Sequence, residues 1–351
     1  GSKNYEGYVI NNSQYYTSNS YYRSGRLYSQ TKYYDDKVMS QKLYNLDGSL
    51  NSDDNYGNLN GEVKSKTENG LLNVTNNFKN GVKHGLQRIT DDSGKVLGEF
   101  NYINGNLHGL SKSYNSSETI SSEVPYYNGL KNGIAKYYDM MGILRSENTY
   151  TFDEYNGKTI RYYVDGSKMY EYESISDTKH GDMIYYNMQG KVIALVGYSF
   201  GYPLYYKVLD KNEQLGEKVE VKPNSDFKIE SKYTNGKKAF EINFKSGYWD
   251  GAMEIYGMDG KHQQISNFKN DKLHNVRKDY YPSGTLYKSE NLLNGDFEGL
   301  QEYYDKDGQL WMSVMYRDDE VHGDLKLYKN GKLQKTKKYD TSILYEIINH
   351  W

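Results

Sequence analysis

The sequence predicts an all-β protein, an elongated antiparallel array of β-hairpins that forms a twisted single-layer ribbon or superhelix. Three observations support this fold class. Glycine recurs in a 24-residue register, an aromatic residue recurs about every 12 residues, and proline, which removes a donor from a strand ladder, occurs only four times in 351 residues. A fixed register indicates stacked supersecondary units, so we expect one repeat copied many times.

The composition argues against both a thick apolar core and disorder. The chain has 41 tyrosines and a mean hydropathy of −0.94, so few aliphatic side chains remain for a deep interior. A chain this polar would be disordered if it lacked aromatic residues, yet 15% of its residues are aromatic. A thin antiparallel sheet resolves the conflict, because tyrosine can lay its ring on the sheet and keep its hydroxyl in water.

A marker glycine, preceded by His, Asn, Asp or Glu, defines the repeat. Glycine supplies a positive φ at no steric cost, so we predict structural turns at these positions. The segments between turns have the length of strands; residues 134–138 and 144–150 represent the two strand types, and together they make a hairpin. The marker glycines are Gly61, Gly85, Gly109, Gly133, Gly157, Gly181, Gly251, Gly299 and Gly323, with Asn275 in the intervening slot.

A tyrosine follows the marker by five places in most repeats, and a second set of aromatic residues follows 12 residues later. Since neighbouring strands lie about 4.8 Å apart, these rings are predicted to form one contiguous cross-strand ladder. Two interpretations remain open: the rings are simply the packed face of the sheet, or part of the ladder stays exposed and binds a partner. The candidate binding residues are Tyr114, Tyr138, Tyr162, Tyr186, Tyr256, Tyr280, Tyr304 and Tyr328.

The register divides the chain into five segments. They are degenerate repeats over 1–60, regular repeats over 61–200, an irregular kink or boundary over 201–226, regular repeats over 227–340 and a C-terminal cap over 341–351. The kink is predicted because the step shortens there and Pro203 and Pro223 fall inside it. The cap is predicted to be a helix, because Leu344, Ile347 and Ile348 share one helical face.

Charge and residue usage exclude several classes of function. The formal charge is −2, with 44 basic and 46 acidic residues interspersed, which argues against nucleic acid and against membrane insertion. Five histidines precede a marker position, but repeats lie about 10 Å apart, too far for one metal ion, so we predict a structural role and no metal. Nothing indicates a nucleophile elbow or phosphate loop, so we expect no cofactor and no enzyme activity.

The repeats resemble a known family. Phe-Lys-Asn-Gly-Val-Lys-His-Gly at 78–85, Tyr-Ile-Asn-Gly-Asn-Leu-His-Gly at 102–109 and Tyr-Tyr-Pro-Ser-Gly-Thr-Leu at 280–286 resemble the bacterial variant of the MORN repeat. This resemblance implies hairpin arrays, in bacterial proteins that are exported, surface-associated or antitoxin-like, without catalytic residues. The segments 162–166 and 303–308 are also similar to the cell-wall-binding repeats of choline- and glucan-binding proteins, which are richer in tryptophan.

These observations favour a non-enzymatic repeat scaffold that binds a protein or a surface polymer. Two alternatives remain: an immunity or antitoxin-like protein that sequesters a toxin, and a cell-wall or glycan-binding module. The chain begins Gly1-Ser2 without Met, which favours an exported protein whose signal was removed, whereas an antitoxin would be cytoplasmic. Unpaired terminal strands would also permit end-to-end self-association.

Overall fold

The computed structural model is all-β and antiparallel, as the sequence predicts, and no helix occurs in the part of the chain that it describes. The described residues are 3–10, 13–21, 25–35, 37–45, 47–55, 60–66, 72–91, 93–340 and 342–350. Among them, no helix is long or apolar enough to cross a membrane. The chain forms two compact units, residues 1–133 and 134–351. The sequence predicts no boundary at residue 133, and its five segments stay predictions.

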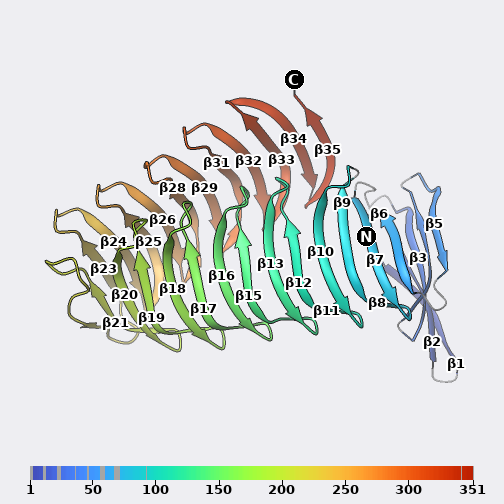
Figure 1. Cartoon of the computed structure of the whole chain (residues 1–351), viewed down its shortest axis with the longest axis horizontal. Coiled ribbons are helices and arrows are strands. Elements are labelled where there is room, and N and C mark those ends of the chain that lie inside the picture. Colours follow the sequence, from blue (N-terminus) through green and yellow to red (C-terminus); the bar gives the residue numbers. More distant parts are fainter. Residues whose placement is uncertain are drawn as a thin grey trace. The chain divides into compact units, whose positions relative to one another are not determined.

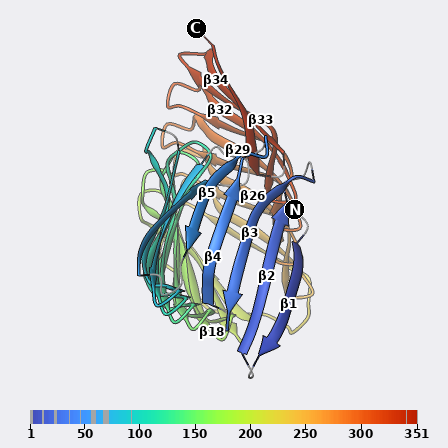
Figure 2. The ribbon, with the colours of Figure 1, turned by 90° about the vertical axis from the view of Figure 1, so that its right-hand side faces the viewer.

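The first unit consists of antiparallel hairpins in two sheets: β1 to β5 form one sheet, and the strands from β6 onward belong to another. Figure 2 shows β1 to β5 in sequential order across one sheet. The strands of this unit are β1 (Lys3–Ile10), β2 (Ser13–Tyr21), β3 (Leu27–Tyr34), β4 (Lys37–Tyr44), β5 (Leu50–Asn55), β6 (Gly61–Lys66), β7 (Leu72–Lys79), β8 (Val82–Lys83), β9 (Gly85–Asp91), β10 (Val96–Ile103), β11 (Asn106–Leu107), β12 (Gly109–Tyr114), β13 (Ile120–Tyr127) and β14 (Leu130–Lys131).

The second unit contains two sheets. The first sheet has β15 (Gly133–Tyr138), which begins at the division, β16 (Leu144–Thr151), β17 (Glu154–Tyr162), β18 (Lys168–Ile175), β19 (Thr178–Tyr186), β20 (Val192–Ser199), β21 (Tyr202–Val208) and β22 (Val219–Glu220). The second sheet has β23 (Phe227–Lys232), β24 (Lys238–Lys245), β25 (Tyr248–Tyr256), β26 (His262–Lys269), β27 (Lys272–Leu273), β28 (Asn275–Tyr280), β29 (Leu286–Leu293), β30 (Asp296–Phe297), β31 (Gly299–Tyr304), β32 (Leu310–Arg317), β33 (Glu320–Lys329), β34 (Lys332–Asp340) and β35 (Ile343–Asn349).

The two sheets of the second unit pack face to face after the chain reverses between β21 and β23 (Figure 1). Met183, Tyr185 and Ile193 of the first sheet share a buried cluster with Phe240 and Ile242 of the second. Each sheet is a single layer, as the sequence predicts, but here two layers cover one another's apolar face. The reason is physical: one layer cannot bury large side chains that all point to one side.

Each repeat carries two kinds of turn. In one, a buried or half-buried residue such as Asp139 caps the turn: its Oδ1 accepts backbone N–H groups of Met141 and Ile143 at 3.0 and 3.1 Å. In the other, two consecutive residues adopt positive φ, as in Asn80 (51°) and Gly81 (76°), which matches the twist of the flanking strands. Both turns therefore follow from their residue types.

The predicted C-terminal helix is wrong: residues 343–349 form β35, which pairs antiparallel with β34. Lys338 of β34 lies 2.8 Å from Glu346 of β35, and Thr336 is in register with Ile348. The free edge of β34 offers backbone groups to a following segment, and β-branched side chains favour the strand. Residues 341 and 351 of the predicted cap lie outside the described residues.

Candidate binding surface

The eight candidate tyrosines occupy equivalent places at the ends of strands. Seven are the last residue of the first strand of a hairpin, and Tyr328 is the last but one of β33. All eight are half-buried. In the sheet register they face aliphatic or polar residues of the next strand, as Tyr186 faces Val192 and Tyr162 faces Lys168. Within each sheet of the second unit, neighbouring members of this set are thus separated by the return strand of a hairpin, which places another side chain between them.

Glutamates hold the hydroxyl groups of several of these tyrosines on the outward side of the sheets. Tyr162 donates to Glu147 at 2.8 Å, and Tyr186 donates to Glu171 at 2.8 Å. Lys168 approaches the same Glu171 to 2.9 Å, so the carboxylate is shared. Burial and the hydrogen bond to Glu171 raise the pKa of Tyr186 to about 12. These rings stay neutral, fixed in position and partly exposed.

The second set of aromatic residues lies on the opposite face, so the single contiguous ladder predicted from the sequence is wrong. Tyr150 and Tyr198 are 4% and 5% exposed and face the interior of the second unit. Tyr185 points into the core and Tyr186 points outward, as consecutive residues of a strand do, while β20 carries one extra residue, Ile193, opposite this pair. The 12-residue spacing crosses this bulge, which changes the face on which each set emerges.

The marker glycines begin or lie within a strand, a few residues beyond the two-residue turn. All nine adopt positive φ, from 77° at Gly181 to 129° at Gly61, and Asn275 adopts 65° in its slot. A Cβ at Gly157 would meet the side chain of Thr149 at 3.1 Å. The backbone conformation therefore favours glycine at every marker, and at Gly157 the close approach of the preceding strand adds to that preference.

In three repeats the side chain before the marker position caps the following repeat. Asn60 Oδ1 accepts the backbone N–H of Asn80 at 3.0 Å, and Glu298 Oε2 accepts that of Asp318 at 3.0 Å. His274 Nδ1 accepts an N–H 20 residues later in the same way, at 3.3 Å. In these three repeats His, Asn and Glu are equivalent, because each presents an acceptor. Among the described residues, no cluster of three or more acidic or histidine side chains suits a metal ion.

Charged side chains tie the two sheets of the second unit together. Arg145 of β16 reaches Asp279 of β28, with Nη2 and Oδ2 2.5 Å apart. Tyr287 of β29 donates to Asp139, in the turn after β15, at 2.6 Å. All four side chains are buried. The contacts span 134 and 148 residues of sequence and fix the register of one sheet on the other.

The second sheet adds further charges to this network. Arg277 and Lys288 lie 3.3 and 3.5 Å from the same oxygen of Asp279, and Lys288 also lies 2.7 Å from Glu290. Burial acts to raise the pKa of Asp279, but Arg277, Arg145 and Lys288 outweigh it and hold that pKa far below its usual range. Asp279 is therefore a carboxylate that neutralises a buried cluster of cations.

The sequence prediction missed this network, although a signal was present. Arg277 stands 24 residues after the buried Met253, and Asp279 stands 24 residues after the buried Ile255. Charged residues thus replace apolar ones in core-facing columns of the repeat. Aligning the repeats and comparing the residues at equivalent positions shows Arg277 and Asp279 as exceptions, whereas reading along the chain does not.

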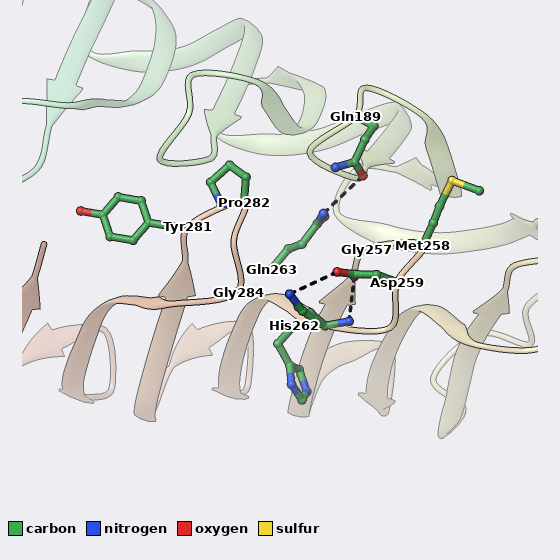
Figure 3. A pocket seen from close by; sticks show the side chains of 10 residues that line it. Gln189, Gly257, Met258, Asp259, His262, Gln263, Tyr281, Pro282 and Gly284 are labelled. Atoms are coloured by element: carbon green, nitrogen blue, oxygen red, sulfur yellow. Dashed lines mark hydrogen bonds and ion pairs between the residues drawn. The ribbon is translucent and has the colours of Figure 1, made fainter. Parts of the chain in front are cut away.

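Turns from both sheets enclose a cavity of about 230 Å³ (Figure 3). Gln263 crosses between the sheets: its Oε1 accepts the Met188 N–H at 2.9 Å, and its Nε2 lies 3.4 Å from Gln189 Oε1. Asp259 and Lys261 lie on the wall, with Oδ2 and Nζ 3.7 Å apart, so these two charges cancel. The cavity suits a small uncharged polar group. Its lining consists of Gln189, Gly257, Met258, Asp259, Lys261, His262, Gln263, Tyr281, Pro282 and Gly284.

Comparison with known proteins identifies one repeat directly. A family model described as "MORN repeat variant" matches residues 297–318, which supports a MORN-variant repeat protein. No curated protein sequence matches the chain. At 10% identity each, similar solved structures include TcdB2-TccC3 (TM-score 0.18; 92% of this chain and 18% of that chain) and the Photorhabdus luminescens Tc holotoxin pore (0.15; 92% and 20%). A eukaryotic initiation factor is similar at 10% identity with a TM-score of 0.21, covering 99% of this chain and 98% of that chain.

The chain thus spans about a fifth of the toxin-complex chains that it resembles. TM-scores this low carry no argument about fold or function. The repeat assignment therefore depends on the family match and on the hairpin register.

Proposed function

We propose that this MORN-variant repeat chain is a non-enzymatic scaffold that binds a partner through the exposed surface of its hairpin array. The observation that carries the proposal is the row of half-buried tyrosines on the outward side of the sheets. Glutamates hold the hydroxyls of four of them: Tyr162, Tyr186, Tyr256 and Tyr304. A fixed aromatic ring loses little conformational entropy on binding, and its amphipathic surface suits protein or sugar contacts.

The buried acidic and basic side chains pair with one another, which supports a scaffold rather than an enzyme. Asp279, Lys288 and Glu290 are 2–3% exposed and pair with one another. A catalytic acid or base has to come within hydrogen-bond reach of its substrate, and these groups lie between two sheets. Asn60, His274 and Glu298, which precede marker positions, accept backbone N–H groups of neighbouring turns. The chemically active residues thus hold repeats and sheets together.

The test replaces outward tyrosines in the full chain and measures partner capture in the source cell by cross-linking and mass spectrometry. Tyr162, Tyr186 and Tyr304 are changed together to Ser, and the matched control changes the same three to Phe. We expect the wild-type chain and the Phe control to enrich the same few partners, and the Ser variant to lose them, because the ring provides the contact area. Absence of any partner enriched over the tag alone would overturn the scaffold function.

A second candidate function is attachment to a surface polymer, which the cavity in Figure 3 favours. Its amides at Gln189 and Gln263, its paired charges and the exposed Met258 would suit one neutral sugar unit. The test is co-sedimentation with purified cell-wall polymer, with Gln263→Leu as the variant and Gln334→Leu, an exposed glutamine outside the cavity, as the control. Equal sedimentation of wild type and Gln263→Leu would refute a role for the cavity.

We further propose that the chain is exported and acts at a cell surface, in the periplasm or outside the cell. Support comes from the resemblance to exported bacterial repeat proteins. Fractionation of the source cell tests this: recovery in the cytosol alone would refute export and favour the immunity alternative. An immunity protein would bind a single toxin encoded next to it, and that toxin would dominate the captured partners.

A further inference from the structure

Two phenylalanines occupy turn positions that disfavour them. Phe152 and Phe200 are the first residues of two-residue turns, with φ of 50° and 45°. A bulky residue with positive φ is an outlier, whereas Asn and Gly adopt this conformation readily. In other repeats the same position holds a residue better suited to it; the asparagines there are Asn80, Asn104, Asn128, Asn270 and Asn294. The strain at the two phenylalanines therefore needs a function to explain it.

Both phenylalanines are also left exposed. Phe152 is 55% and Phe200 62% exposed, and Phe200 rests on the ring of His180 with centroids 5.1 Å apart. They lie two hairpins apart on one edge of the first sheet of the second unit, about 19 Å from tip to tip at about 4.8 Å per strand. We define the turn-edge ridge by six exposed apolar residues: Phe152, Tyr155, Ile175, Phe200, Tyr202 and Leu204.

The charges around this ridge are mainly acidic. Asp153, Glu154 and Asp177 are exposed in its turns. Of the lysines near the ridge, Lys179 packs its Nζ 3.7 Å from the centre of the Trp249 ring and Lys158 lies 3.4 Å from Glu171, while Lys222 is exposed beside Leu204 at one end. An apolar row bordered by carboxylates is complementary to a segment that is apolar on one side and basic on the other.

The backbone of the ridge leaves little for an added strand to pair with. The Gly201 N–H donates to the Lys179 carbonyl at 2.8 Å, and the Asp177 N–H donates to the Tyr155 carbonyl at 3.1 Å. Adjacent turns thus use one another's polar groups. A partner is therefore held by side chains, as an amphipathic helix is, rather than by β-strand addition.

We propose that the turn-edge ridge is a docking site for a basic amphipathic helix of a partner protein. At a rise of 1.5 Å per residue, about 13 helical residues span the distance between the two phenylalanines. The inference rests on the proposed scaffold function and names the surface and the partner chemistry for it. Apolar side chains of the helix pack between Phe152 and Phe200, and its lysines or arginines face the acidic turns.

The test uses the full chain and a fluorescent 18-residue peptide of leucine and lysine arranged with helical periodicity. The variant is Phe152→Asn with Phe200→Asn, which installs the residue that other repeats hold at this turn position. Because asparagine relieves the backbone strain, we expect the melting temperature to stay equal or rise, while peptide affinity falls at least tenfold. The matched control, Leu293→Asn with Leu300→Asn, removes two exposed leucines of the second sheet and should leave peptide affinity unchanged.

Several outcomes would overturn the ridge proposal. Equal peptide affinity for wild type and the double Phe variant would do so, as would equally tight binding of a leucine and glutamate peptide of the same pattern. Loss of vesicle binding or of self-association in the Phe variant, with peptide affinity unchanged, would assign the ridge to a membrane or to a second copy. If the Phe variant still captures the wild-type partners in cells, the ridge proposal fails and the scaffold function stands. If the wild type captures none, the scaffold function itself fails.

Discussion

Replacing Asp279 with Asn tests whether charge balance holds the two sheets of the second unit together. Asp279 is 2% exposed, and its Oδ2 lies 2.5 Å from Arg145, 3.3 Å from Arg277 and 3.5 Å from Lys288. Asparagine has the same shape but no charge. The variant leaves the buried Arg145 and Lys288 and the half-buried Arg277 with one carboxylate fewer, and an uncompensated buried charge costs about 3–5 kcal/mol of folding free energy.

The effect should depend on pH in a definite direction. The folded state holds the pKa of Asp279 well below the unfolded value of about 3.9, so its contribution is fully present above that value and is lost as pH falls through the folded pKa. We therefore expect a constant difference between wild type and variant from about pH 5 upward, and a shrinking difference in stronger acid.

Urea denaturation followed by tryptophan fluorescence measures this free energy. All three tryptophans belong to residues 134–351, so the signal reports the second unit. Asp259→Asn is the control: this carboxylate is exposed, lies 3.7 Å from Lys261, and should change stability by less than about 1 kcal/mol. Adding Arg145→Met to Asp279→Asn removes the excess charge and should recover at least about 1 kcal/mol. A loss below about 1 kcal/mol for Asp279→Asn alone would refute the reasoning.

Three other substitutions and titrations probe the repeat itself. Tyr281→Phe removes a 2.9 Å hydrogen bond to the Tyr304 carbonyl and should cost about 1 kcal/mol in urea denaturation; an unchanged midpoint would contradict the bond's role. Gly157→Ala should cost more than Gly166→Ala, since both have positive φ but only the new methyl group at residue 157 would meet a neighbour, the β-branched Thr149, at 3.1 Å; equal melting temperatures would disprove this. Tyr186, with its pKa raised to about 12, should resist ionisation in an absorbance titration, and Tyr186→Phe should lower the amplitude of the late step by one tyrosine, since the pKa values of Tyr150, Tyr172 and Tyr281 are also raised to about 12; an unchanged amplitude would contradict this. Because the folded pKa is raised, the contribution of Tyr186 to stability is lost as pH rises from about 10 toward 12.

Local order in the repeats was predictable from sequence because it depends on neighbouring residues. The predicted strand 134–138 corresponds to β15 (Gly133–Tyr138), and 144–150 corresponds to β16 (Leu144–Thr151). Residues 343–349 were assigned to a helix because a short apolar run satisfies helical and strand periodicity equally, and only the free edge of β34 decides between them. The family resemblance agrees with the MORN-variant match at 297–318.

Contacts between the two sheets could not be predicted from local sequence patterns. An extended ribbon and a folded-back pair of sheets have the same 24-residue register, and they differ in pairs such as Arg145 and Asp279, 134 residues apart. The outward position of Tyr186 and the inward position of Tyr198 depend on a bulge that shifts the alternation. The eight candidate tyrosines were found by spacing, but the exposed Phe152 and Phe200 interrupt the pattern and were therefore overlooked.

The long-range ties in the second unit also restrict how this protein can grow or shrink in evolution. Links between consecutive repeats span about one period, as from Tyr281 to Tyr304, and tolerate insertion or loss of a whole unit elsewhere. The pairs Arg145–Asp279 and Tyr287–Asp139 instead join positions on the two opposing sheets, the two arms of the second unit. Insertion of one hairpin into only one of these sheets would move the paired residues away from each other. Equal insertions in both sheets would keep the pairs aligned. We therefore expect related chains to vary in length by symmetric pairs of units between residues 139 and 287.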